Sequence, residues 1–354
     1  MGSGLLIQPT GLAALERLGL RSATADLGQR IDRLHGQTAR GRTIFDLGYR
    51  GLGDDIYAVA VHRAALHGVL WDAFQRSGVP FFPGHEVLSP EDPGLAGADF
   101  AIDASGARSA LRAAVTDKAP RPFPYGAVWA SVPDTGIAPG TLAQRYDRAQ
   151  VMLGYLPVGR RVATESPLAA IFWSLRADQY EPWRGGFDAW RETARALWPA
   201  LGPVLDGLNG PDAFTHATYG HFSTPKPWLG NLVLIGDSAH TTSPQLGQGA
   251  NQALIDAVVL ADAIAISPDP QSAFALYART RRAHVRFYQG ASWAMTRFFQ
   301  SDSATLPAIR DAIFHPMRRI PWMHGEMLRT LSGVKTGVFT AATPDAIVNK
   351  LAKP

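Results

Sequence analysis

The chain has 354 residues, of which 46% are hydrophobic and 18% charged, and its formal net charge is +4. This length and composition indicate a folded protein of two or three domains and exclude a disordered or fibrous one. The sequence contains no cysteine, which excludes disulfides, zinc–thiolate sites, iron–sulfur clusters and catalytic thiols. Redox chemistry would therefore need an organic cofactor or a site built from histidines and carboxylates.

Further sequence patterns bear on the protein's cellular location and on the kind of ligand that it binds. No dense Lys/Arg run with interleaved aromatics occurs, which argues against nucleic-acid binding. No apolar run reaches the roughly 18 residues of a membrane span, and no secretory signal pattern opens the chain. We therefore expect a cytoplasmic protein whose mildly basic charge suits an anionic, phosphate-bearing ligand. We expect no metal site, because His216 and His221 would face opposite sides of a strand.

The first third of the chain predicts alternating helices and strands. Residues 10–20 predict a helix capped by Thr10, and residues 43–60 predict short strands. Residues 59–78 have the pattern of a long amphipathic helix. Residues 98–112 predict a strand, a glycine turn and a helix.

The pattern of apolar and polar residues changes twice in the rest of the chain. Residues 121–180 alternate apolar and polar positions and carry aromatics, which favours an antiparallel sheet inserted between two α/β parts. Residues 231–237 predict a buried strand that ends in a turn, and residues 249–266 predict a strong helix. Residues 270–331 are predicted to be mostly helical, with prolines separating the pieces.

The segment from Leu232 to Leu260 combines three features that suit a ligand. An apolar strand delivers Asp237 at its carboxyl end, the edge where open α/β sheets bind ligands. Gly247 and Gly249 allow backbone N–H groups to approach a ligand closely. The helix that follows directs its N-terminus at the same place. A carboxylate and a glycine-lined helix start can together bind a ribityl hydroxyl and an electron-rich ring edge.

This segment resembles the second flavin-binding motif of the FAD-dependent aromatic-hydroxylase family. The family pattern is Gly-Asp-x-x-His, then Pro, then Gly-Gln-Gly-x-Asn, then an Asp in the helix. The matching residues are Gly236, Asp237, His240, Pro244, Gly247, Gln248, Gly249, Asn251 and Asp256. The resemblance implies that Asp237 binds the ribitol or pyrophosphate of FAD. It also implies that the amides of residues 247–251, Ala250 included, lie at the flavin N1/O2 edge, with Pro244 beside the ring.

His240 has two interpretations within that resemblance. It is either a catalytic residue beside the flavin or a histidine whose role is structural.

Two shorter segments also resemble motifs of this family. The stretch 99–109 is similar to the middle motif, but Ser105 stands where the family has Asp, and Asp103 lies two residues earlier. The family motif serves FAD and NAD(P)H, so this departure puts the use of a pyridine nucleotide in doubt. The alternative is a plain strand–turn–helix junction capped by Ser105. Arg63 matches a helix start that contacts FAD, or is a solvated surface residue.

The family begins with a strand, Gly-x-Gly-x-x-Gly and a helix, and this sequence shows no such unit. By comparison, Gly2 aligns just after the second strand of the family. We expect weak FAD binding and exposed apolar surface where strands would pair. A start codon placed too late, a shortened gene product and a partner that supplies the unit are all consistent with the sequence.

The resemblance implies an α/β fold with a Rossmann-like FAD-binding domain, truncated at its N-terminus. An antiparallel β-sheet substrate domain is inserted into it, and helices follow at the C-terminus. We expect the first part of the FAD-binding domain at residues 1–115 and the substrate domain at 116–225. The second part of the FAD-binding domain is expected at 226–270 and the helical region at 271–354.

The implied activity is that of an oxidoreductase, an FAD-dependent monooxygenase. It would hydroxylate an aromatic or otherwise electron-rich small organic substrate with O2 through a flavin C4a-hydroperoxide, with NAD(P)H as reductant. The C-terminal stretch resembles the ubiquinone-pathway hydroxylases, which would suit a large apolar substrate. Five sheet aromatics either cover the substrate pocket or form ordinary core: Trp129, Tyr146, Tyr155, Phe172 and Trp173.

Two alternatives come from other functional classes. Gly236-Asp237-Ser238 echoes the nucleophile block of one esterase group, which would make Ser238 the nucleophile of a hydrolase. The chain could also be a degenerate, non-catalytic flavoprotein relative that serves as a binding protein.

Overall fold

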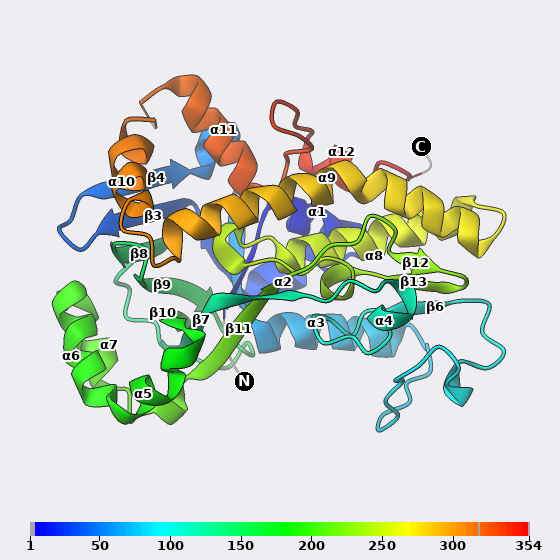
Figure 1. Ribbon diagram of the computed structural model, residues 1–354, viewed down its shortest axis with the longest axis horizontal. Helices are drawn as coiled ribbons and strands as arrows, with labels where there is room; N and C mark the ends of the chain where they lie inside the picture. The colour runs from blue at the N-terminus through cyan, green and yellow to red at the C-terminus, as the bar shows by residue number, and fades with distance from the viewer. Residues whose placement is uncertain (1–3, 318, 353–354) are drawn as a thin grey trace.

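The computed structural model describes residues 4–317 and 319–352, which form three sheets with helices around them (Figure 1). The sheets have the strand orders β1-β5-β2, β11-β7-β10-β9-β8-β3-β4 and β12-β13-β6. Together with the helices they confirm the expected mixed α/β fold with an antiparallel sheet and C-terminal helices. Short 3-10 turns lie at Tyr49–Leu52, Pro93–Leu95, Ala177–Gln179, Pro199–Leu201 and Pro211–Ala213.

The first sheet contains the N-terminal strand of the described chain. Strand β1 (Gly4–Ile7) pairs antiparallel with β5 (Ala58–His62), which also pairs with β2 (Gln29–Ile31). Helices α1 (Pro9–Arg17) and α2 (Arg21–Leu27) follow β1. The predicted cap was wrong: Gln8 occupies the capping position, and Thr10 is buried in the first helical turn.

Helix α3 (Arg63–Arg76) starts four residues later than predicted. Residues 59–62 belong to β5, every residue of which is buried. A strand flanked by strands on both sides and covered on both faces gives a continuous apolar run, which periodicity alone does not distinguish from a helix.

The largest sheet confirms the antiparallel segment predicted at 121–180. Its antiparallel strands are β7 (Arg121–Pro133), β8 (Thr141–Asp147), β9 (Val151–Gly159), β10 (Leu168–Arg176) and β11 (Thr215–His221). Strands β3 (Arg33–Thr38) and β4 (Thr43–Gly48) extend it through a parallel pairing of β3 with β8. Strands from the first third of the chain therefore join the inserted sheet.

The two faces of this sheet have different partners. Helices α5 (Tyr180–Gly185), α6 (Phe187–Leu197) and α7 (Gly202–Asp206) cover one face, where Tyr155 and Trp173 lie in the core. Tyr146 and Phe172 belong to the core on the other face, and Trp129 packs against it. Of the five predicted sheet aromatics, these last three are thus available to the rest of the molecule.

The third sheet carries the predicted strand before Asp237. Strand β13 (Leu232–Leu234) is buried, pairs parallel with β6 (Ala101–Asp103) and antiparallel with β12 (Trp228–Leu229). Among the described strands β6 has a single neighbour, and Ile102 on it is 44% exposed.

The C-terminal half is helical, as predicted. Helix α4 (Arg112–Val115) precedes the large sheet, and α8 (Gly249–Ile266) has the predicted bounds. The later helices are α9 (Pro270–Phe299), α10 (Leu306–Met317), α11 (Pro321–Leu331) and α12 (Pro344–Val348). In the described residues α8 alone has the length and hydropathy of a membrane span, but it contacts α1 and α9 as a core helix does.

Candidate functional site

The strand β13 leads into a 3-10 turn, η6 (Gly236–Ser238), that only glycine can open. Gly236 has a φ of +59°, and a Cβ on it would lie 3.0 Å from the Cβ of Ala253. Its N–H donates to Oδ2 of Asp256 at 2.9 Å. The turn is therefore held against α8, and it presents Asp237 at the carboxyl end of the strand.

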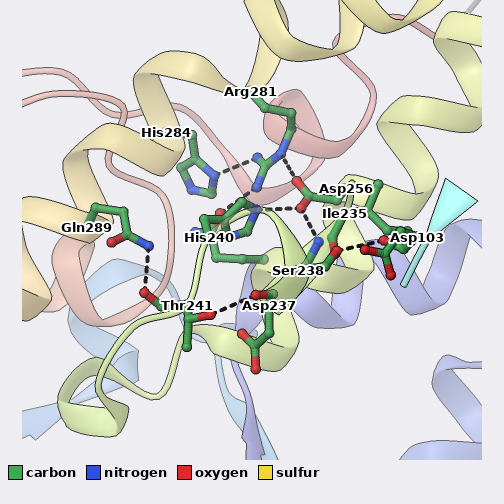
Figure 2. A network of polar contacts seen from close by, with 12 residues as sticks. Asp103, Ile235, Asp237, Ser238, His240, Thr241, Asp256, Arg281, His284 and Gln289 are labelled. Atoms are coloured by element: carbon green, nitrogen blue, oxygen red, sulfur yellow. Dashed lines mark hydrogen bonds and ion pairs between the residues drawn. The ribbon is translucent and has the colours of Figure 1, made fainter. Parts of the chain in front are cut away.

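The carboxylate of Asp237 has no hydrogen bond or ion pair with any other described residue. Figure 2 shows it turned away from the polar network that surrounds it. The side chain reaches solvent, yet protein atoms around it raise the pKa of the carboxyl through burial. The positive charges of His240, Arg63 and Arg112 oppose that rise. Asp237 is thus a hydrogen-bond acceptor without a partner among the described residues, in a positively charged setting.

The loop after the turn brings free backbone N–H groups to the same place. It runs through η7 (Pro244–Leu246) to Gly247, whose φ is +60°, and α8 begins at Gly249. Within the described chain no protein acceptor receives the N–H groups of residues 248–251, as is usual for a helix N-terminus. A Cβ on Gly249 would lie 3.9 Å from Oδ1 of Asp237. The carboxylate and the helix start therefore face one space.

The side chains of Gln248 and Asn251 point into the protein. Asn251 accepts the N–H of Gln8 at 2.9 Å and donates to the carbonyls of Leu6 and Gly247 at 3.1 and 2.8 Å. Gln248 donates to the carbonyl of Leu331 at 2.7 Å. Both side chains hold the loop against neighbouring segments. Gln248 and Asn251 could therefore contact a cofactor only through their backbone.

His240 is buried in the network drawn in Figure 2. Its Nε2 lies 2.5 Å from Oδ2 of Asp256, and Nε of Arg281 donates to Oδ1 of the same carboxylate at 2.6 Å. Burial raises the pKa of Asp256, but the charges of His240 and Arg281 outweigh it, and the pKa falls well below its usual range. The geometry gives His240 a structural partner, and its catalytic role stays a prediction.

The network continues across α9. Arg281 donates from Nη1 to Nδ1 of His284 at 2.7 Å, and Nε2 of His284 donates to the carbonyl of Gly333 at 2.6 Å. Burial, together with the charge of Arg281, lowers the pKa of His284 to about 3. His284 is therefore neutral at physiological pH.

Arg112 links the two sequence motifs, and sequence reasoning missed it. Its guanidinium donates to the carbonyls of Ser238 and Asp237, at 2.9 and 3.1 Å, and to two carbonyls of the 106–107 turn. The side chain is buried beneath the ring of Phe222. Arg112 is the last residue of the predicted strand–turn–helix segment 98–112, and nothing local distinguished it from a surface arginine.

The stretch 99–109 forms a turn organised by Asp103 rather than by Ser105. Oδ1 of Asp103 accepts the N–H and hydroxyl of Ser105 at 2.8 and 2.6 Å, and Oδ2 accepts the hydroxyl of Ser109 at 2.5 Å. Helix α4 starts only at Arg112. The idea that Ser105 caps the helix was wrong.

The remaining predicted site residues lie on the elements around Asp237. Arg63 is the first residue of α3, exposed, without an ion pair in the described residues, and its charge acts on Asp237. Pro244 opens η7 and is half-buried. Their contacts with FAD, like those of Gly236 and Ala250, stay predictions.

Ser238 does not have the setting of a nucleophile. It is fully buried, and its hydroxyl bonds the carbonyls of Asp103 and Ile235, both at 2.7 Å. The neighbouring His240 faces Asp256 instead. A serine nucleophile needs a base within reach and an open face for the substrate, so the hydrolase alternative is not supported.

Comparisons with known proteins agree with this geometry. Residues 96–287 match the family described as "FAD binding domain". The chain is 28% identical to 3-amino-4-hydroxybenzoate 2-monooxygenase of Streptomyces cremeus, over 81% of this chain and 76% of that protein. It is 25% identical to aurachin C monooxygenase/isomerase of Stigmatella aurantiaca, over 90% and 85%. Its fold is similar to that of Klebsiella pneumoniae HpxO complexed with FAD and uric acid, with a TM-score of 0.75, 20% identity and coverage of 94% and 88%.

Proposed function

This chain belongs to the FAD binding domain family and is an FAD-dependent monooxygenase, and we propose that it hydroxylates an aromatic, predominantly apolar substrate beside the loop after Asp237. The observation that supports the site is the convergence of the free Asp237 carboxylate, the exposed Arg63 and the open amides at the start of α8.

The residues of this space fit the flavin and ribityl part of FAD. A carboxylate that lacks a protein partner can accept hydrogen bonds from ribityl hydroxyls. The N-terminus of α8 supplies N–H donors and partial positive charge to an acceptor edge, and stabilises negative charge that develops there. Gly247 and Gly249 keep side chains out of the way of that approach. When bound, FAD supplies the transfer of electrons to O2 that the protein's own groups lack.

The substrate wall is proposed on the face of the large sheet that meets this loop. Gln245 of the loop donates to Gln300 at 2.6 Å, and Gln300 donates to the carbonyl of Gly126 on β7 at 3.3 Å. On the same strand, the ring of Trp129 lies 4.4 Å from that of Phe172 and donates to the hydroxyl of Tyr219. Trp129 is half-buried, so it can still offer ring surface to an aromatic substrate.

The residues of the chain would orient the substrate and exclude water. The aromatic pair of β7 and β10 holds an apolar ring by contact, and the loop bound to Gln300 closes the space from the side of α9. The network around Asp256 serves as support, because it fixes the turn of Gly236 and Asp237 without reaching the substrate space itself.

NAD(P)H is the proposed reductant, and a cytoplasmic location is part of the proposal. The reductant is proposed from the family resemblance as a whole, because residues 99–109 depart at Ser105 from the motif that serves both nucleotides. The packing of α8 inside the protein supports a location without a membrane span.

The proposal is tested with the purified full chain and added FAD. Oxidation of NADH and of NADPH is followed together with O2 uptake, using 3-amino-4-hydroxybenzoate and aurachin C as trial substrates. We expect one atom of 18O from labelled O2 in each hydroxylated product, and faster O2 uptake with substrate present. Flavin binding without incorporation of 18O into any aromatic substrate would contradict the monooxygenase proposal while leaving the flavin site intact.

A further inference from the structure

The C-terminal part of the fold exposes an unusual amount of apolar side chain. Of the sixteen large hydrophobic residues that are exposed in the described chain, six lie within residues 306–341. They are Ile309, Ile313, Ile320, Trp322, Val338 and Phe339. Phe339 has the largest exposed fraction of the sixteen, 82%. We call the surface formed by α10, α11 and the turn at 335–341 the C-terminal apolar surface.

Two parts of this surface, α11 and the turn at 335–341, are neighbours in space. In Figure 1, α11 and the red turn that follows it project from the same edge of the molecule. Lys335 in the turn forms an ion pair with Glu326 of α11, which holds the two side by side. Ile309 and Ile313 are one turn of α10 apart and share one side of that helix.

The tip that carries Val338 and Phe339 is held by many contacts. Lys335 and Ala341 form a β-bridge, and the N–H of Thr336 donates to the carbonyl of Thr340 at 3.0 Å. The buried Nζ of Lys335 also donates to the carbonyl of Val338 at 2.7 Å. The two apolar side chains are therefore displayed by a fixed turn, and their exposure is a property of the fold.

The charge around this surface is positive. The described residues 306–317 and 319–341 contain four Lys or Arg and two Asp or Glu. Two of the four cations, Arg310 and Lys335, are buried. Both acids are already paired, Glu326 with Lys335 and Arg329, and Asp311 with Arg310. Arg319 is exposed and has no ion pair among the described residues. The exposed Arg319 and the half-buried Arg329 are therefore the cations that the described part of this surface presents beside its apolar side chains.

A second apolar patch lacks this charge and serves as a comparison. Val79, Phe81, Phe82 and Leu88 are also strongly exposed, with Phe82 at 77%. Residues 77–99 around them contain four Asp or Glu and no Lys or Arg. Both patches thus expose large apolar side chains, but of the two only the C-terminal apolar surface also carries positive charge.

We propose that the C-terminal apolar surface binds the interface of an anionic phospholipid bilayer. Side chains such as Trp322 and Phe339 insert at the level of the headgroups, where amphipathic helices and fixed apolar loops bind membranes. Arginines beside them add electrostatic attraction to anionic lipids. The protein lies on the membrane in this arrangement and does not cross it.

The experiment measures sedimentation of the full chain with vesicles of phosphatidylcholine, with and without phosphatidylglycerol. We expect binding to the vesicles that contain phosphatidylglycerol, and weaker binding as salt rises. The double variant Val338→Ser/Phe339→Ser and the single variant Trp322→Ser should each bind about tenfold more weakly, as large apolar side chains leave the interface. Phe82→Ser, an equally exposed aromatic in the acidic patch, should bind like the parent protein.

Three outcomes would overturn the proposal. They are no binding to phosphatidylglycerol vesicles at about 0.1 M salt, equal binding to vesicles of phosphatidylcholine alone, and the same loss of binding in Phe82→Ser. If the double variant instead changes the oligomeric state in gel filtration while vesicles stay unbound, the surface is a contact between copies of the chain. Circular dichroism and flavin binding of each variant confirm that its fold is intact.

Discussion

Oδ2 of Asp256 accepts the backbone N–H of Gly236 at 2.9 Å, so a carboxylate in the middle of α8 anchors the turn that carries Asp237. The same carboxylate meets His240 on one oxygen and Arg281 on the other. Because these partners come from the loop and from α9, one buried group fixes the turn, the loop and two helices relative to each other. Asp256 acts on the flavin site through the backbone and does not reach it.

Replacing Asp256 with Asn should therefore destabilise the fold strongly. The substitution leaves the buried guanidinium of Arg281 without its carboxylate, and breaking a buried pair in this way costs about 3–5 kcal/mol. Urea unfolding followed by circular dichroism measures the loss. Asp262→Asn, also on α8, is the matched control. It removes a partly exposed ion pair with Arg17 of α1 and should cost about 1 kcal/mol or less. Equal losses in the two variants would contradict the role given to Asp256.

The backbone part of the site was predictable because its signals are local. The strand before Asp237, the glycines of the loop and the start of α8 lie within about two dozen residues, and the structure places α8 at the predicted bounds. A short segment with a strand, a glycine loop and a helix has few ways to fold, so residue type and spacing were enough.

The supporting network was not predictable in the same way. Arg281 and His284 lie on a helix that the sequence predicted only as helical, and their partners follow from how α8 and α9 cross. The strand β5 and the pairing of β3 with β8 depend in the same way on neighbours distant in sequence. Local periodicity carries no information on such crossings.

Asp237→Ala should weaken flavin binding while leaving the fold unchanged. The carboxylate has no partner in the described protein, so its removal breaks no internal contact. A hydrogen bond to a charged group is worth about 1.5–3 kcal/mol, and this is the expected loss of flavin affinity. Quenching of flavin fluorescence gives the dissociation constants, with Asp212→Ala, an exposed acid beside Arg184, as control. An Asp237→Ala variant that keeps full affinity would remove Asp237 from the site.

Gly249→Ala should weaken flavin binding at the start of α8 without changing the stability of the protein. The added methyl would lie 3.9 Å from Oδ1 of Asp237, an ordinary contact, so the fold can accept it. The methyl occupies space that the ligand approaches, and crowding of this kind costs about 1–3 kcal/mol of binding. Thermal unfolding and flavin titration test both halves of the prediction. Gly290→Ala in α9, with no atom within 4 Å of the new Cβ, should leave flavin affinity unchanged; parallel behaviour of the two variants would count against a ligand at Gly249.

His284 should make the stability of the protein depend on pH between about 3 and 6.5. In the folded state its pKa is lowered to about 3, chiefly by burial and also by the charge of Arg281, whereas an unfolded histidine titrates near 6.5. Below pH 6.5 the unfolded chain therefore binds a proton on His284 that the folded chain does not bind. Stability falls as the pH decreases through that window, by about 1.4 kcal/mol for each pH unit.

His284→Gln removes this titration and keeps the bonding pattern. The amide oxygen of glutamine can accept from Arg281, and its NH2 group can donate to the carbonyl of Gly333, as the two ring nitrogens do. Urea unfolding at several pH values from 4 to 8 should give curves that differ by a constant above pH 7 and converge as the pH falls. Groups that the two proteins share cancel in the difference. A constant difference across the whole range would mean that His284 has the same pKa in the folded protein as in the unfolded chain, and the lowered pKa assigned to it would be wrong.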